Sequence, residues 1–212
     1  MKSVVIDVWH SHCTQPRTAW VMPDGCQDVI VTFSENALPN IKISPLHTCA
    51  TPVQLNPNQH MVGLRLAAGF DTHSLNLNQL YRYVDDTSEL VAAIESSTKQ
   101  ETSQVQEVLA CLQSEPLSIQ STALTLGVSS RTLQRLLKSQ TSYSPMFWLR
   151  LARVRSAAKM ILAQQPLGQV AHHCHYSDQA HMSREIKHWL GTTPTQLHHR
   201  SDIANQLLAP GY

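Results

Sequence analysis

Two hydrophobic patterns divide the chain. Near its start, short runs of β-branched and other apolar residues are separated by turn signals such as Pro23-Asp24-Gly25 and Asn56-Pro57-Asn58. These runs predict strands at 4–9, 19–22, 28–33, 41–43 and 61–66. Farther along, apolar residues recur at helical spacing. The sequence therefore predicts an α+β fold, with a small N-terminal sheet or partial barrel followed by a helical region.

Two helices are expected to connect the strands to the C-terminal half. Asp86-Thr87-Ser88 can cap a helix through residues 89–94. A second helix is indicated by apolar residues at Val105, Val108, Leu109 and Leu112. Ser114-Glu115-Pro116 then breaks the chain and is the expected linker. Both helices are expected to cover the sheet, and pairing across a two-fold axis is the alternative.

The segment from Ala123 to Leu133 has the spacing of a helix-turn-helix. Ala123 is small, so two helices can approach each other closely there. Gly127 can take the left-handed conformation that ends the first helix. Ser129 or Ser130 can cap the second helix by accepting a free backbone N–H. Leu133 would then pack the second helix back onto the first.

A weaker copy of this unit begins at Ala171. His175 stands where the first unit has its glycine, and Ser177-Asp178 is the expected capping pair. Met182 takes the packing role of Leu133, one residue later than in the first unit. The chain thus repeats one element twice within its basic half.

A long helix is predicted between the two units. Pro145 opens it, and one face is apolar at Phe147, Leu151, Val154, Ala158 and Ile161. A helix of about 18 residues spans ~27 Å. Major grooves on one face of B-DNA recur about every 34 Å. Two recognition helices, one at each end of the long helix, would therefore cover a site of roughly 18–20 bp.

These residues resemble the DNA-binding domain of the AraC/XylS family of bacterial transcription regulators, over residues 117–200. The matching segments are 126–135, 149–155 with Ala157, Ala158 and Leu162, 176–179, 183–184 and 191–194. The family usually has Gly where His175 stands and Phe where Met182 and Ile186 stand. The resemblance implies a regulator that binds double-stranded DNA and activates transcription through contact with RNA polymerase, while the residues themselves leave a repressor as the alternative.

The N-terminal region is similar to the domain of unknown function often found ahead of AraC-type domains. Residues 23–26, 28–30 and 63–70 carry this likeness. The predicted organisation is therefore a β-rich sensory or dimerisation domain at 1–85, a helical linker region at 86–115, a double helix-turn-helix domain at 116–200 and a tail at 201–212. A homodimer and a small-molecule effector fit this organisation as partners.

Charge separates the two halves more sharply than the net charge of +1 suggests. Residues 1–116 carry six Lys or Arg against twelve Asp or Glu, a net charge of −6. Residues 117–200 carry ten Lys or Arg against two acidic residues, a net charge of +8. A solvated basic face is the plain alternative, but two helix-turn-helix units in the same segment favour a polyanion-binding surface.

In each helix-turn-helix unit, the outer face of the second helix carries residue types that bind bases and phosphates. Arg135 and Arg184 stand two residues after the packing apolar residue, where an arginine can bind guanine through two hydrogen bonds. Phosphate contact alone is the alternative. The predicted DNA-binding set is Arg131, Gln134, Arg135, Lys138, Gln179, Ser183, Arg184 and Lys187, with Ser129 and Ser177 as caps that offer a helix-terminal N–H to phosphate.

Other chemistry has weaker support. Consecutive ligand-type residues at 172–175 point in different directions on a helix and cannot close a tetrahedral metal site. Cys13, Cys26 and Cys49 leave two alternatives, a metal- or thiol-responsive regulator and an Ada-like methyl-accepting repair regulator, although their spacing does not match the latter. No nucleophile elbow, phosphate loop or metal-ligand pattern is present, so no enzyme, metal or cofactor is predicted.

The N-terminal aromatic residues are candidates for an effector pocket. Trp9, Trp20 and Phe33 could line one, with ordinary core packing as the alternative. The first residues do not form a signal peptide, because Asp7 interrupts the apolar run. No apolar run approaches the ~18 residues of a membrane span. A cytoplasmic protein without a membrane partner is expected, and its free thiols fit a reducing compartment.

Overall fold

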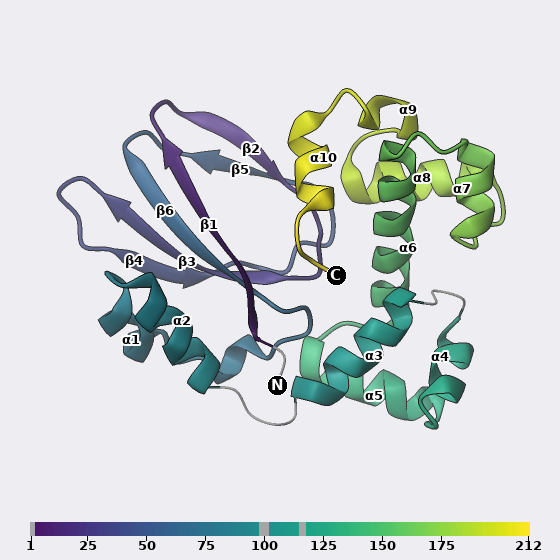
Figure 1. The fold of residues 1–212 in the computed structure, drawn as a ribbon, viewed down its shortest axis with the longest axis horizontal. Helices are drawn as coiled ribbons and strands as arrows, with labels where there is room; N and C mark the ends of the chain where they lie inside the picture. Colours follow the sequence, from purple (N-terminus) through teal and green to yellow (C-terminus); the bar gives the residue numbers. More distant parts are fainter. Residues whose placement is uncertain (1–2, 98–101, 115–117) are drawn as a thin grey trace.

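The computed structural model describes residues 3–97, 102–114 and 118–212. Glu115 and Pro116, in the predicted linker, lie outside these residues. The described chain forms a β-rich N-terminal half and a helical C-terminal half, arranged side by side as an α+β fold (Figure 1). The strands are β1 (Val5–Cys13), β2 (Arg17–Val21), β3 (Gln27–Ser34), β4 (Asn40–Ile43), β5 (Thr51–Leu55) and β6 (Gln59–Leu66).

The strands form two antiparallel sheets. The larger has the order β1-β6-β3-β4, and the smaller pairs β2 with β5. Within the larger sheet, Gly63 of β6 lies opposite Trp9 of β1 and Ile30 of β3. The five predicted strands are confirmed, whereas β5 was not predicted because Pro52 and Gln54 interrupt its apolar pattern. Proline is tolerated in β5 because a strand at a sheet edge needs fewer ladder hydrogen bonds.

One hydrophobic core lies on the larger sheet. Alternating residues of β3 and β6, such as Val31 and Leu64, point to the same face and are almost fully buried. They pack with Leu90 and Ile94 of α2 (Thr87–Ser96) and with the short helix α1 (Leu77–Leu80). Asp86 caps α2 by accepting two backbone N–H groups, as the sequence predicts.

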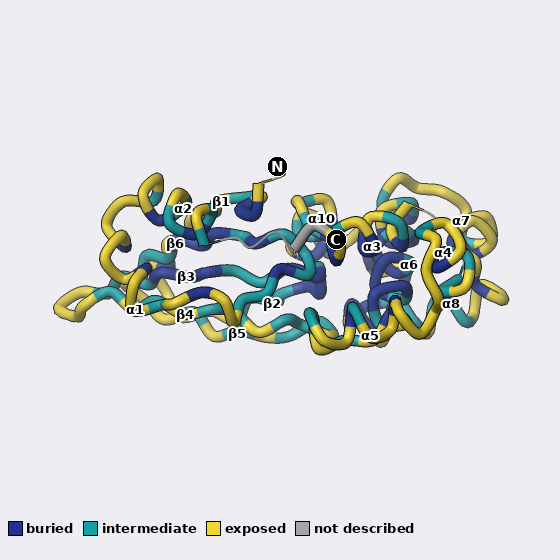
Figure 2. Tube along the Cα trace, turned by 90° about the horizontal axis from the view of Figure 1, so that it is seen from below, coloured by how far each residue is buried: buried dark blue, intermediate teal, exposed yellow. Residues whose placement is uncertain are grey.

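A second core surrounds the long helix in the C-terminal half. The helices there are α3 (Thr102–Ser114), α4 (Ile119–Thr125), α5 (Ser130–Thr141), α6 (Pro145–Leu162), α7 (Leu167–His173), α8 (Gln179–Leu190), α9 (Pro194–Leu197) and α10 (Ser201–Leu208). Figure 2 shows buried chain concentrated along α6. The expectation that the helix around Val105–Leu112 covers the sheet is wrong. Its apolar stripe packs against α6, α4 and α5 instead.

The last twelve residues, expected as a tail, form a helix and a terminal segment that join the two halves. In Figure 1, α10 lies between the strands and α6. Ile203 and Leu207 are buried, and the Tyr212 ring packs edge-on against Trp148 with centroids 5.1 Å apart. The backbone N–H of Tyr212 also donates to the carbonyl of Asp24 at 2.8 Å.

A buried polar network lies beside these contacts between the two halves. Arg155 of α6 is 2% exposed and donates to the carbonyls of Pro23 and Leu207 at 3.4 Å each. Arg65 of β6 lies 3.3 Å from Asp24 and 3.2 Å from Asp28. Burial raises the pKa of Asp24 despite the nearby arginines. The two halves therefore meet through a largely buried interface, in which Arg155 of α6 binds one carbonyl oxygen from the strand-bearing half and one from α10.

Candidate DNA interface

The first helix-turn-helix unit consists of α4, a short turn and α5. A hydrogen bond from the Val128 N–H to the Ala123 carbonyl, at 2.9 Å, closes the turn. Gly127 lies in it with φ of +66°, the left-handed conformation that the sequence predicts. Ser129 accepts a backbone N–H of the first helical turn at 3.0 Å, so Ser129 rather than Ser130 caps α5.

The second unit, formed by α7 and α8, repeats this geometry. The Tyr176 N–H donates to the Ala171 carbonyl at 2.9 Å, as in the first turn. His175 takes the position of Gly127 with φ of +56°. A left-handed conformation is uncommon for residues other than glycine, but histidine is among those that adopt it. The internal repeat inferred from sequence is thus also a repeat of turn geometry.

Ser177 does not cap α8, so that expectation is wrong. Asp178 stands three positions after His175, whereas Ser129 stands two positions after Gly127. The longer second turn brings Asp178 into the capping position, where its carboxylate accepts a backbone N–H at 2.6 Å. The Ser177 hydroxyl instead lies 3.0 Å from the ring of a histidine on α8. The same extra residue explains the one-residue offset between the two units.

The cap of α5 provides a direct test of this geometry. We expect Ser129→Ala to lower the free energy of unfolding by about 1 kcal/mol, because one N–H of α5 loses its acceptor. Ser130→Ala is the matched control and should change it by less than about 0.5 kcal/mol, since Ser130 is exposed and lies inside the helix. Urea unfolding of both variants measures the difference. Equal losses would show that Ser129 is not the cap.

The second helix of each helix-turn-helix unit, α5 or α8, packs on the long helix α6 through its inner face. Leu133 and Leu137 of α5, and Met182 and Ile186 of α8, are at most 1% exposed. They belong to the same core as the buried residues of α6. The 18 residues of α6 correspond to a length of about 27 Å. This single rigid element therefore positions α5 and α8 together.

An ion pair also fixes α8 on α6. Arg150 donates to both carboxylate oxygens of Glu185, at 3.0 and 2.6 Å. Burial alone would raise the pKa of Glu185, but the hydrogen bond and charge of Arg150 hold it below its usual range. No local sequence signal pairs these residues, which are 35 positions apart. The pair neutralises Glu185 and leaves Arg184 and Lys187 as exposed cations of α8.

The outer faces of α5 and α8 are open to solvent and carry most of the predicted contact residues. Two of these side chains contact their own helix. The Lys138 ammonium donates to the carbonyl of Ser142 at 2.8 Å, and the partly buried Ser183 hydroxyl donates to the carbonyl of Gln179 at 2.9 Å. The exposed residues are Arg131, Gln134, Arg135 and Lys138 on α5, and Gln179, Arg184 and Lys187 on α8.

Residues 122–200 match the family model described as a helix-turn-helix domain. This segment is an AraC-type helix-turn-helix domain. Domains of this type belong to DNA-binding transcription regulators. No curated protein matches the chain.

Solved structures similar to the chain include the following three. The C-terminal domain of AraT, a response regulator from Geobacillus stearothermophilus, is 24% identical with a TM-score of 0.43; the match covers 48% of this chain and 88% of that one. ToxT from Vibrio cholerae is 9% identical with a TM-score of 0.47, over 91% of this chain and 95% of that one. A probable AraC family transcriptional regulator from Rhodopseudomonas palustris is 21% identical with a TM-score of 0.41, over 47% and 97%.

The three aromatic residues suggested for an effector pocket lie on three different strands, two in the larger sheet and one in the smaller sheet. The Trp9 ring covers the backbone of Gly63 and leaves no room for a side chain there. Phe33 stacks on His60 with ring centroids 5.8 Å apart, and Trp20 is 40% exposed on the smaller sheet. An effector pocket that uses all three stays an untested prediction.

The described cysteine and histidine side chains do not converge on a metal-binding site. Among residues 3–97, 102–114 and 118–212, no three His, Cys, Asp or Glu side chains come together as a metal-binding group. Cys26 is buried beside Asp24, and burial raises the pKa of its thiol to about 12. A thiol held protonated in this way is a poor nucleophile, which weighs against a thiol-responsive role for Cys26. None of the described helices has the length and apolar character to cross a membrane.

Proposed function

We propose that this chain binds double-stranded DNA sequence-specifically and regulates transcription, with α5 and α8 in successive major grooves. The observation that carries the proposal is the structural repeat. Two helix-turn-helix units with the same turn hydrogen bond are held by one helix, α6, and each exposes arginine and lysine on its outer face. Residue types of this kind in this position hydrogen-bond base edges and phosphates.

The proposed roles of the contact residues follow from their chemistry. Arg135 and Arg184 would each bind a guanine through two hydrogen bonds, because both are exposed near the middle of their helices. The other side chains would bind adenine or phosphate: Arg131, Gln134 and Lys138 on α5, and Gln179, Ser183 and Lys187 on α8. The backbone N–H groups at the start of α5, next to Ser129, would bind phosphate. At the start of α8 the Asp178 carboxylate already accepts a backbone N–H and would repel phosphate, so Ser177 would contact DNA through its hydroxyl.

The N-terminal half is proposed to control this binding. We divide the chain into a sensory or dimerisation domain at 1–85, a connecting region at 86–115 and a DNA-binding domain at 116–200. The buried contacts of Arg155 and Tyr212 connect the strand-bearing half to α6. A change of conformation in the strands would therefore be transmitted to α6 through these contacts. RNA polymerase and a second copy of the chain are the further partners proposed.

Selection from random duplexes tests the proposed function. The full-length chain should enrich one sequence family at physiological salt, and its affinity should fall steeply as salt rises, because phosphate contacts release counterions. Binding that stays salt-sensitive but enriches no sequence would contradict the proposal, since only non-specific attraction by the basic half would remain.

A further inference from the structure

A loop of the N-terminal half, the β4–β5 loop (residues 44–50), reaches the helical half. Its first residue, Ser44, is held on β3. The Ser44 N–H donates to the carbonyl of Asp28, and the Ser44 hydroxyl accepts the N–H of Asp28, at 2.8 Å each. At the other end, Thr51 begins β5 and pairs with Val21 of β2. The loop is therefore anchored in a sheet at both ends.

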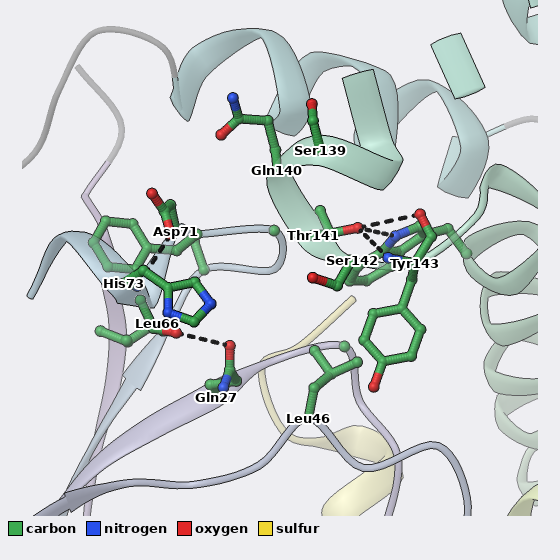
Figure 3. Close-up of a pocket in the computed structure, with 16 residues that line it drawn as sticks. Gln27, Leu46, Leu66, Asp71, His73, Ser139, Gln140, Thr141, Ser142 and Tyr143 are labelled. Carbon is green, nitrogen blue, oxygen red and sulfur yellow. Dashed lines mark hydrogen bonds between the residues drawn. The ribbon is translucent and has the colours of Figure 1, made fainter. Parts of the chain in front are cut away.

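Between these anchors, the loop adds two apolar side chains to the core around α6. Leu46 and Ala50 are partly buried and pack against that core. Leu46 and Tyr143 line the same cavity, which Figure 3 shows in close-up. Tyr143 directly follows Ser142, the left-handed C-cap of α5. Leu46 thus lies near the C-terminal end of the first recognition helix.

The same loop forms a hydrogen bond with the end of α8, the second recognition helix. The Ala50 N–H donates to the carbonyl of Trp189 at 2.7 Å. Trp189 lies in the last turn of α8, where carbonyl groups have no partner within the helix. A Cβ atom added at Gly191, the C-cap of α8, would lie 3.5 Å from the Cβ of Ala50. The N-terminal half therefore supplies a donor that α8 lacks and packs against its end.

Aromatic contacts join the two places where the loop meets the helices. The Phe147 ring of α6 lies 4.3 Å from the Tyr143 ring and 5.4 Å from the Trp189 ring, measured between centroids. Aromatic pairs at these distances attract each other beyond the area that they bury. The C-terminal ends of α5 and α8 are thus connected through one side chain, and the β4–β5 loop contributes a contact to each end.

We propose that the β4–β5 loop fixes α5 and α8 relative to each other and so sets the spacing between the two DNA segments that the chain reads. Leu46 and Ala50 are positioning residues, which act through the helices. At about 27 Å, α6 is shorter than the roughly 34 Å between successive major grooves. The tilt of each recognition helix on α6 therefore decides how far apart the base-reading side chains stand. This role rests on the proposed function, whereas the contact between loop and helices does not.

Duplexes of altered spacing test this role on the full-length chain. One base pair is inserted or removed between the two protected segments of the selected duplex. The unsubstituted chain should bind the original spacing about ten-fold more tightly than either altered spacing. Leu46→Ala should reduce this preference to about three-fold or less, because α5 and α8 then adjust more easily to the altered duplex. A loss of stability alone would weaken binding to all three duplexes in the same proportion, and that result would overturn the proposal.

Two control variants separate the position from the substitution. Leu46→Met keeps an apolar side chain of similar volume and should retain the spacing preference. Leu38→Ala makes the same change between β3 and β4, at a side chain that is 84% exposed, and should also retain it. If Leu38→Ala or Leu46→Met reduces the preference as much as Leu46→Ala does, the positioning role of Leu46 is overturned.

Hydrogen exchange of the chain without DNA tests the contact separately. In Leu46→Ala, the amides in the last turns of α5 and α8 should exchange at least about three-fold faster, because these ends open more easily when the loop holds them less firmly. Leu38→Ala should exchange like the unsubstituted chain. Unchanged exchange at both helix ends in Leu46→Ala would show that the loop does not hold them.

Failure of this proposal is distinguishable from failure of the proposed function. If the unsubstituted chain selects no DNA sequence, the proposed function is contradicted and the spacing role is overturned with it. The exchange rates still decide, in that case, whether the loop holds the two helix ends. If the chain selects a sequence and Leu46→Ala keeps the full spacing preference, the positioning role alone is overturned.

Discussion

Gly25→Ala is expected to lower the free energy of unfolding by roughly 2–5 kcal/mol, the largest stability loss that we predict. Gly25 has φ of +76°, a conformation that strains any L side chain. A Cβ atom there would lie 2.7 Å from the Cβ of Tyr212 and 2.9 Å from the Trp148 ring. Trp148 is fully buried, so it has no space into which to move. Strain and overlap therefore add at the joint between the two halves.

Gly127→Ala separates these two causes. Gly127 also has positive φ, at +66°, but an added Cβ would meet nothing within 4 Å. Only the backbone strain applies, so a loss of about 1–2 kcal/mol is expected. Urea unfolding of both variants gives the comparison. If Gly25→Ala costs no more than Gly127→Ala, the two halves are not packed as tightly at this position as the structure indicates.

Arg135→Ala and Arg184→Ala are each expected to weaken specific DNA binding by about 1–3 kcal/mol and to relax sequence preference at one position. The two arginines lie on separate helices, so the double variant should lose roughly the sum, about 2–6 kcal/mol. Fluorescence anisotropy with the selected duplex and with a shuffled duplex measures affinity and specificity together. Non-specific binding to the shuffled duplex should fall much less.

Arg82→Ala is the control for the arginine variants. It removes one positive charge from an exposed position in the N-terminal half, away from both recognition helices. Its effect on specific binding should be small. If Arg135→Ala matters and Arg184→Ala does not, α8 contacts the DNA backbone without reading bases. If neither matters, the assignment of base-reading side chains is wrong.

Local signals made the helix-turn-helix units predictable from sequence. Gly127 and Pro145 mark a helix end and a helix start through backbone conformation that one residue determines by itself. The cap of α8 is not determined by residue type, because Ser177 and Asp178 are adjacent and both are good caps. The length of the turn decided between them, and no residue type encodes that length.

Features that depend on tertiary packing were harder to predict. The apolar stripe of α3 shows that the helix is buried, but not that α6 rather than the sheet covers it. The joint at Tyr212 escaped prediction because its partners, Gly25 and Trp148, lie far away in the chain. A cavity between the two halves is the extreme case, since its lining residues, such as His73 and Ser142, come from segments that have no sequence pattern in common (Figure 3).

Hydroxyl-radical footprinting of the intact chain on its selected duplex tests the central claim most directly. Two recognition helices held by α6 should protect two patches on one face of the DNA, with centres about 34 Å or one helical turn apart. A single protected patch, or two patches on opposite faces of the duplex, would contradict the claim that both units read successive major grooves.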